Sequence, residues 1–116
     1  MVMPMVERRT YTGFYTIASG SSGKVSIFTV PPGKIAIIRK AVFWFPTGSE
    51  GELYVALSTG GRRLVPTSGW INGDNTKIEL EPNETAESSF TVDLEYMNTS
   101  STESHSVFVA LEVDIE

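Results

Sequence analysis

Apolar and polar residues alternate in short segments along most of this chain, and this period constrains its fold more than any other feature. The clearest run closes the chain: aliphatic residues recur at every second position from Val107 to Ile115, and Glu112, Asp114 and Glu116 occupy the opposite face. A period of two is typical of a β-strand with one dry and one wet face. No segment repeats apolar residues at helical spacing between capping residues, so we expect an all-β protein.

Turn-forming segments separate the alternating runs. Pro31-Pro32-Gly33-Lys34 suits a type II turn, in which Pro32 fixes φ and Gly33 accepts a positive φ. We expect the segment Ser19–Gly23 to be a flexible hairpin connection. Further turns are predicted at residues 47–51, 59–61, 72–74, 82–84 and 98–104. Together these breaks predict an antiparallel β-sandwich of about eight strands, jelly-roll-like if the strands follow two Greek keys, with a closed barrel as the alternative.

The length of 116 residues corresponds to one domain, which we divide into an N-terminal arm, residues 1–9, and a single β-sandwich domain, residues 10–116. The absence of cysteine excludes disulfides, zinc–cysteine sites and thiol nucleophiles. The longest apolar stretch, residues 35–45, is interrupted by two basic residues and is far shorter than the roughly 20 residues that cross a bilayer. The first residues lack the apolar run of a secretory signal. We therefore expect no membrane partner.

Charge is distributed unevenly along the chain, whose formal net charge is −5. All nine Lys and Arg residues lie in residues 1–77 beside four acids, whereas residues 78–116 hold ten acids and no base. One interpretation is that the two parts interleave in a single sandwich and neutralise each other. The other is that a basic patch of one subunit meets an acidic patch of the next. The acidic net charge argues against nucleic acid as the main partner.

One predicted strand, residues 35–45, breaks the alternation. Towards its end Phe43 and Phe45 point one way, and Val42 and Trp44 point the other. Apolar residues on both faces of a strand in a two-layer sandwich imply a second cover, either the N-terminal segment or a neighbouring chain. Two alternatives remain: a bulge at the basic pair in the middle of the strand, which would shift the parity locally, and a single exposed aromatic residue.

The N-terminal segment carries apolar side chains that a free terminus would leave in water. Met3 and Met5 flank Pro4, which blocks regular structure, and Arg8 and Arg9 follow. We consider two arrangements: packing of the segment against its own sandwich, and an arm that crosses onto another subunit. The second arrangement makes the two methionines and the two arginines candidate partner-binding residues.

Residues that could carry catalysis are few. His105 is the single histidine, and no Gly-x-Ser-x-Gly nucleophile elbow accompanies it, so we expect a surface histidine. One histidine without cysteine also excludes multi-histidine and thiolate metal sites. The glycines of residues 19–23 do not precede a helix and therefore do not form a phosphate-binding loop. We predict no enzymatic activity, no cofactor and no metal.

Carboxylates line the polar faces of three predicted strands, at residues 79–81, 93–95 and 112–116. Side by side they would repel, so they either lie apart or face strands that carry Arg and Lys. Calcium binding and a glycosidase-like acid pair are the alternatives, and no Asp-x-Asp-x-Asp-Gly loop supports calcium.

Three aromatic residues, Trp44, Tyr54 and Trp70, offer surface on which sugar rings could stack, as in sandwich-type carbohydrate-binding modules. The alternative is packing in the core and at interfaces. Trp70 lies in a turn-rich stretch and is the best candidate for an exposed aromatic residue. Arg62 and Arg63 follow two glycines at a predicted loop tip, where they either bind a carboxylate-rich partner surface or remain solvated.

Three segments resemble a known group of proteins. Phe28-Thr-Val-Pro-Pro-Gly-Lys-Ile-Ala-Ile-Ile-Arg-Lys-Ala-Val42 looks like the opening of small β-sandwich proteins from tailed-phage and related virus particles. Leu80-Glu-Pro-Asn-Glu-Thr85 is similar to their second turn, and Val107-Phe-Val-Ala-Leu-Glu-Val113 resembles their final strand. Asn83 stands where that second turn has a glycine.

This resemblance implies a virion structural or capsid-decorating protein, located in the virion and assembled in the host cytoplasm. The expected partners are the protein itself, in a cyclic homo-oligomer such as a trimer, and a capsid or other virion protein. The candidate partner-binding residues are Met3, Met5, Arg8, Arg9, Trp44, Arg62, Arg63 and Trp70. The alternative function is a carbohydrate-binding module that acts in adhesion, with a glycan as its partner.

Overall fold

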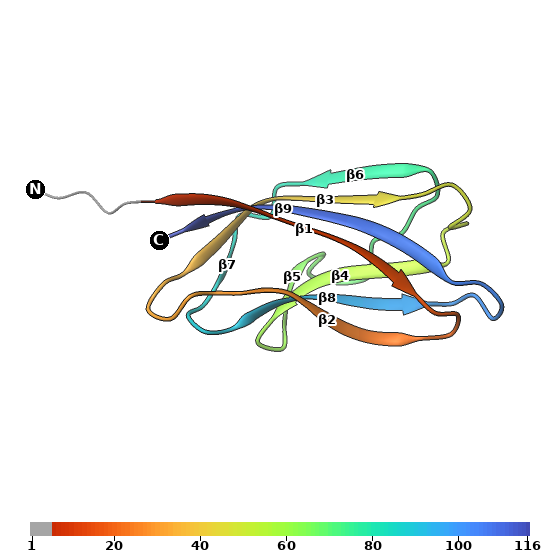
Figure 1. Ribbon diagram of the computed structural model, residues 1–116, viewed down its shortest axis with the longest axis horizontal. Helices are drawn as coiled ribbons and strands as arrows, with labels where there is room; N and C mark the ends of the chain where they lie inside the picture. Colours follow the sequence, from red (N-terminus) through yellow and green to blue (C-terminus); the bar gives the residue numbers. More distant parts are fainter. Residues whose placement is uncertain (1–5) are drawn as a thin grey trace, which may run out of the picture.

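Two antiparallel sheets pack face to face in the computed structural model, which describes residues 6–116 (Figure 1). The strands are β1 (Glu7–Ile17), β2 (Ser22–Thr29), β3 (Ala36–Phe45), β4 (Leu53–Thr59), β5 (Arg62–Val65), β6 (Thr76–Leu80), β7 (Glu84–Ala86), β8 (Thr91–Asn98) and β9 (His105–Ile115). The first sheet has the order β1-β9-β3-β6, with β7 also paired to β3, and we call it the β1 sheet. The second has the order β2-β8-β4-β5, and we call it the β2 sheet. The predicted antiparallel β-sandwich is confirmed.

The strand pairs are nested from the two ends of the chain towards its middle. β1 pairs with β9, β2 with β8, β3 with both β6 and β7, and β4 with β5. A ribbon of antiparallel pairs rolled into two sheets is a jelly roll, so that topology is confirmed and the closed barrel is wrong. β6 and β7 share one position beside β3 and are separated by residues 81–83, which include Pro82 and Asn83, whose φ is 49°. This break gives nine strands where about eight are predicted.

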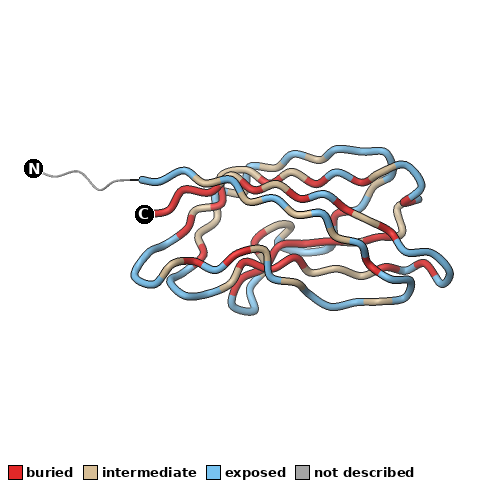
Figure 2. The backbone as a smooth tube through the Cα atoms, in the orientation of Figure 1, coloured by how far each residue is buried: buried red, intermediate tan, exposed pale blue. Residues whose placement is uncertain are grey.

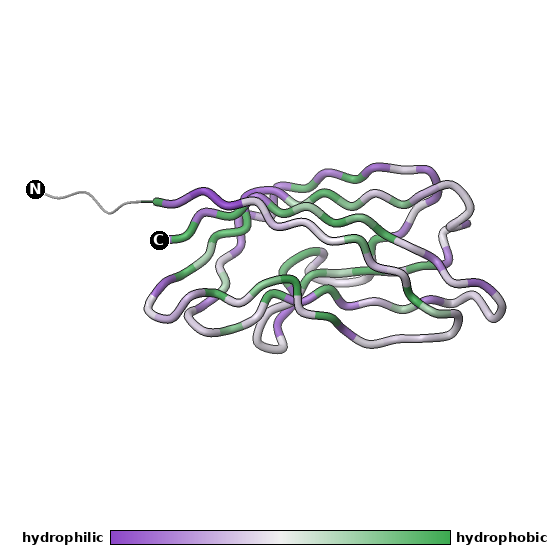
Figure 3. The backbone as a smooth tube through the Cα atoms, in the orientation of Figure 1, coloured by the Kyte–Doolittle hydropathy of each residue, from purple (hydrophilic) through white to green (hydrophobic). Residues whose placement is uncertain are grey.

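The core lies between the two sheets and uses the inward parity of each strand (Figure 2). Every second residue of β9 from Val107 to Ile115 is buried, as the alternation predicts. Hydrophobic stretches follow the strands that cross the middle of the sandwich (Figure 3). The largest fully buried side chains include Phe43, Phe45, Ile38, Leu53, Leu57, Leu64, Leu94 and Leu111. Burial of these side chains supplies the main stabilisation in a chain without disulfides.

Two connections differ from the sequence predictions. β1 and β2 belong to different sheets, so the predicted hairpin at Ser19–Gly23 is wrong. The reason is that β1 finds its partner in the last strand over all 11 of its residues, a distant pairing that no local turn signal reveals. Arg62 and Arg63 begin β5 instead of lying at a loop tip, because Gly60 and Gly61, with φ of 55° and 78°, turn the chain tightly after β4.

The predicted N-terminal arm falls into two parts. Residues 1–5, which include Met3 and Met5, lie outside the described residues. Residues 7–9 are the first residues of β1 and pair with the end of β9, so Arg8 and Arg9 are strand residues. In the part of the chain that the structure describes, no helix is long and apolar enough to cross a membrane.

Residues from the basic and acidic parts of the chain alternate across both sheets. Arg8 and Arg39 pair with Asp114 in the β1 sheet, and Arg63 pairs with Glu95 in the β2 sheet. The interpretation that the two parts interleave and neutralise each other is therefore confirmed. Contact between unlike patches of two subunits stays a prediction.

Candidate protein-binding surface

Three aromatic side chains lie next to one another on the outer face of the β1 sheet. The register places Phe14 of β1 opposite Phe108 of β9, and Phe108 opposite Trp44 of β3. Their exposed fractions are 64%, 37% and 51%. We call these three residues the aromatic row. Contiguous exposed apolar surface of this kind marks sites of protein–protein contact.

The alternation of β3 turns Trp44 towards water. Phe43 and Phe45, on either side of it, are fully buried in the core. The register of β3 against β9 shifts between Ile38 and Lys40, so the predicted bulge is confirmed. Trp44 lies beyond this bulge in regular strand, and the bulge does not remove it from the outer face. The expectation of apolar residues on both faces of this strand is correct, and their cover by another chain stays a prediction.

The outer face of the β1 sheet changes along the strands from apolar to charged. Successive rows of residues, one each from β1, β9 and β3, are Phe14-Phe108-Trp44, Thr12-Ala110-Val42, Thr10-Glu112-Lys40 and Arg8-Asp114-Ile37. On β6, Lys77 continues the first row and Glu79 continues the second. On β1, β9 and β3, half of the face thus carries aromatic and small side chains, and the other half carries charges of both signs.

Asp114 is the centre of the charged half. It accepts hydrogen bonds from Nε of Arg8 and, at 2.8 Å, from Nε of Arg39, and its side chain is only 10% exposed. These two guanidinium groups, Arg8 first, hold the pKa of Asp114 below its ordinary value. Arg8 and Arg39 therefore bind strands β1, β3 and β9 together at this end of the sheet.

The outer face of the β2 sheet has a cover of its own. From β5, Arg63 donates to Glu95 of β8 at 3.1 Å and to the carbonyl oxygen of Gly69 at 2.6 Å. Its guanidinium group lies 4.5 Å from the ring centroid of Trp70. Ala56 of β4 is fully buried although it is not part of the core cluster, which shows that this face is shielded. We call Arg63, Glu95, Gly69 and Trp70 the Arg63 clamp.

A groove of about 430 Å³ lies beside the Arg63 clamp. Trp70, Tyr96 and Met97 supply its apolar walls, and Lys24 and Glu95 supply charge. Because Arg63 already lies over the Trp70 ring, only part of that ring is free for a ligand.

The structure does not bring the predicted partner-binding residues together in one place. Trp44 and Arg8 lie on the outer face of the β1 sheet, and Arg63 and Trp70 lie on that of the β2 sheet. Arg62 donates to the carbonyl oxygen of Thr85 at 2.6 Å and pairs with Glu84, both in β7. Arg9 donates to Glu7 at 2.7 Å and to the hydroxyl oxygen of Tyr11 at 3.3 Å.

Phe14 and Phe108 are the candidate binding residues that the sequence interpretation missed. Each is the aromatic residue at a wet-face position of a strand whose other parity is apolar. The sequence of each strand alone shows this exposed aromatic position. It does not show that β1 pairs with β9, which places the two rings side by side.

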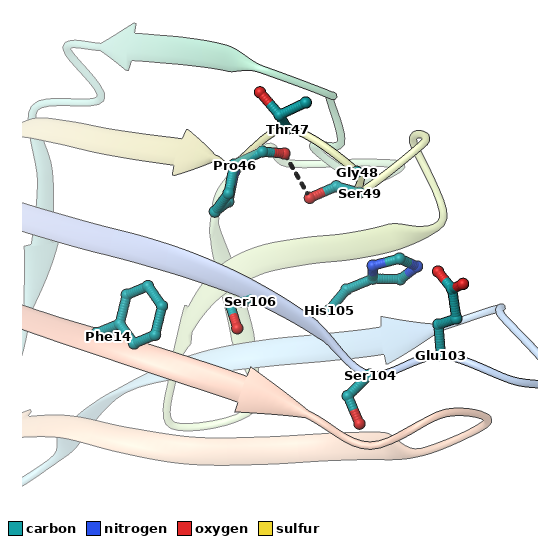
Figure 4. A pocket seen from close by; sticks show the side chains of 9 residues that line it. All are labelled: Phe14, Pro46, Thr47, Gly48, Ser49, Glu103, Ser104, His105 and Ser106. Atoms are coloured by element: carbon teal, nitrogen blue, oxygen red, sulfur yellow. Dashed lines mark hydrogen bonds between the residues drawn. The ribbon is translucent and has the colours of Figure 1, made fainter.

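A second cavity, of about 320 Å³, lies at the end of the sandwich beside Phe14 (Figure 4). The expected surface histidine is wrong: His105 is buried, because the first position of β9 has the inward parity, and its Nε2 lies 3.0 Å from Oε1 of Glu52. The nearby hydroxyl groups of Ser49 and Ser106 hydrogen-bond to the carbonyl oxygen of Pro46 and to Thr16. His105 thus contacts Glu52, and the hydroxyl groups of Ser49 and Ser106 bond to other groups.

Metal ligands do not gather in the described residues. No group of three or more His, Asp or Glu side chains in residues 6–116 is arranged to hold a metal ion. Of the carboxylates predicted to line three strands, four meet basic side chains: Glu79, Glu95, Glu112 and Asp114.

Comparison with known proteins shows a shared fold. No protein-family model matches the sequence, and no curated protein matches it. A chain from a structure of infectious bursal disease virus, Gt strain, superposes with a TM-score of 0.65 and 9% identity over 95% of this chain. This chain spans only about a third, 31%, of that one.

Two phage capsid structures contain chains of similar size. One is from the cyanophage Pam1 capsid asymmetric unit, with a TM-score of 0.57 and 12% identity over 98% of this chain and 91% of that chain. The other is from the capsid of Helicobacter pylori bacteriophage KHP30, with a TM-score of 0.56 and 12% identity over 95% of this chain and 93% of that chain. The resemblance to β-sandwich virion proteins therefore holds for the fold.

Proposed function

We propose that this chain is a non-enzymatic virion structural protein that decorates or stabilises a capsid through protein–protein contacts in a homo-oligomer. The observation that carries the proposal is the aromatic row, exposed on one face of a jelly roll whose fold is shared with chains of virus capsids. The partners are further copies of the chain and a capsid or other virion protein. Its location is the virion, after assembly in the host cytoplasm.

The aromatic row offers enough apolar area to support an interface. An aromatic side chain presents about 150–250 Å². Covering the exposed parts of three such rings removes on the order of 300 Å² from water, a gross gain on the order of 7 kcal/mol. Association costs offset most of this gain, so a single contact is weak and its repetition on a symmetric particle supplies avidity.

Some of the other predicted partner-binding residues remain candidates in this proposal. Arg62 is about half exposed beside Glu84, so it remains accessible to a carboxylate-rich surface. Met3 and Met5 supply apolar side chains at the terminus. A variant that lacks residues 1–5 leaves β1 intact, and it tests their contribution without removing strand residues.

Mass spectrometry of density-purified virus particles tests the proposed function. The particles are prepared from cells that carry this gene, and the matched cell lysate is the control. We expect the protein in many copies per particle, and we expect it to remain bound after washing. Its presence in the lysate together with its absence from the particles would contradict the proposal.

The alternative, a carbohydrate-binding module, is supported by the groove beside Trp70. An exposed tryptophan beside charged side chains is the arrangement that sugar rings use for stacking and hydrogen bonding. A glycan array with the wild type, Trp70→Ala and Trp44→Ala separates the candidates. Binding that Trp70→Ala abolishes and Trp44→Ala retains supports this alternative, and the absence of binding to any glycan excludes it.

A further inference from the structure

The outer face of the β1 sheet carries a pattern that is complementary to itself. On its two central strands, β9 and β3, the register pairs Glu112 with Lys40 and Phe108 with Trp44. In the first pair an acidic residue of β9 lies beside a basic residue of β3, and in the second pair both residues are aromatic. A rotation that exchanges β9 with β3 therefore places each of these residues over a suitable partner.

We propose that this face binds the same face of a second copy, about a two-fold axis parallel to the strands and between β9 and β3. The inference rests on the proposed function and deepens it by naming the surface and its occupant. Glu112 of one copy then meets Lys40 of the other, and Phe108 meets Trp44. Stacked sheets with nearly aligned strands, about 10 Å apart, are a common packing in β proteins.

The outer strands satisfy the same symmetry. Phe14 on β1 meets Lys77 on β6 of the other copy, a ring beside a cation. In the next row Thr12 meets Glu79. No charged side chain in these rows faces one of its own sign, so these rows bring no charge repulsion.

The other two-fold arrangement of the same face is less favourable. An axis across the strands through the aromatic row would place Lys77 of one copy over Lys77 of the other. It would also carry the charged rows around Asp114 beyond the end of the second sheet, where they meet no surface. Charge repulsion and lost area both select the axis parallel to the strands.

The size of the face agrees with a stable contact. Four strands and eight residues of length make a face about 19 Å wide and about 26 Å long. Its plane area is about 500 Å² per copy, or about 1,000 Å² for two copies, which is close to the lower limit for a specific interface.

Charge reversal on the full chain, read by sedimentation velocity at micromolar concentration, tests the pairing. We expect the wild type at twice the mass of one chain. Lys40→Glu and Glu112→Lys should each sediment as a single chain, because each homodimer then opposes like charges twice. An equimolar mixture of the two variants should regain the double mass, since that heterodimer opposes Glu to Lys at both places.

The mixture of the two variants shows whether the charged residues act between two copies or within one chain. Lys40 also lies 3.8 Å from Glu79 and Glu112 lies 4.0 Å from Arg8 within one copy, and mixing two variants repairs neither contact. Trp44→Glu should abolish the dimer, and its thermal unfolding should match that of the wild type at a concentration low enough for the wild type to be a single chain. The matched control is Phe90→Glu, which alters an aromatic residue that is 46% exposed outside this face and should leave the dimer intact.

Three results would overturn the inference: a wild type of single-chain mass throughout, a species of three chains, or a mixture of the two variants that stays monomeric. A monomeric wild type that is nevertheless found in purified particles would remove this pairing and leave the proposed function standing. A protein that forms the predicted dimer but is absent from purified particles would support this pairing and contradict the proposed function.

Discussion

The two outer faces of the sandwich differ in how they are covered. On the β2 sheet, Arg63 donates to Glu95 and Gly69, and Ala56, which pairs with Glu95, is fully buried. On the β1 sheet, the corresponding small residue, Ala110, is only partly buried, and the three rings of the aromatic row lie exposed beside it. Within residues 6–116 the chain thus shields one face itself and leaves apolar area open on the other.

Because of this difference, we expect one face to contribute to the stability of the single chain and the other to its association with a partner. The Arg63 clamp supplies burial within one copy, so its contribution belongs to the free energy of unfolding of the single chain. The aromatic row gains its burial only when another molecule covers it, so its contribution belongs to association. Substitutions on the two faces should therefore move different observables.

The largest effect on unfolding is expected from enlarging the shielded face. Ala56 is fully buried, so the longer side chain of Ala56→Gln must displace whatever covers it, which we expect to lower the free energy of unfolding by about 1–3 kcal/mol. Ala110→Gln, the matched change on the open face, should alter it by less than about 0.5 kcal/mol. Denaturant unfolding measures both variants. Equal losses would show that the two faces are not covered differently.

Removal of the clamp itself should have the next largest effect. Arg63→Ala loses a partly buried ion pair and the contact with the Trp70 ring, and we expect a loss of about 1–2 kcal/mol. Tryptophan emission should shift to longer wavelength as Trp70 becomes exposed. Arg62→Ala, which removes a more exposed ion pair, is the control and should cost less than about 0.5 kcal/mol.

The charged half of the open face predicts a pH dependence. The pKa of Asp114 is lowered in the folded chain, so its ion pairs stabilise the protein above the unfolded-state pKa, and this contribution is lost as pH falls through the folded value. Asp114→Asn should therefore lower the melting temperature at neutral pH, and the difference from the wild type should shrink as pH falls below about 4. A difference that does not change with pH would contradict the assignment.

The sequence predicted the strands well because their information is local. The alternation from Val107 to Ile115 and the turn at Pro31–Lys34 are properties of consecutive residues, and both appear in the structure. The association of β1 with β9 depends on which distant strands match best. The sequence alone therefore revealed Trp44 and missed the other two rings that complete the row.

The surroundings of Arg63 and His105 could not be predicted from the sequence for a similar reason. Arg63 reads as a solvated residue after two glycines, and only the strand pairing of β4, β5 and β8 places it over Glu95. His105 likewise reads as part of a polar turn, and its inward parity follows from the start of β9. The local sequence pattern pointed to these residues, but the pairing of distant strands determines which residues surround them.

The smallest effect on unfolding is expected at the aromatic row. Trp44→Ala should change the free energy of unfolding by less than about 0.5 kcal/mol, because the ring is already half exposed in the single copy. The same variant should lose self-association in light scattering. A destabilisation as large as that of Arg63→Ala would show that the ring serves the fold and not assembly.

Hydroxyl-radical footprinting of the wild type at low and high protein concentration tests the central claim most directly. Oxidation of Phe14, Trp44 and Phe108 should fall together as concentration rises, while oxidation of Phe90, exposed elsewhere, stays constant. Unchanged oxidation of the three rings at every concentration would show that no protein covers the outer face of the β1 sheet.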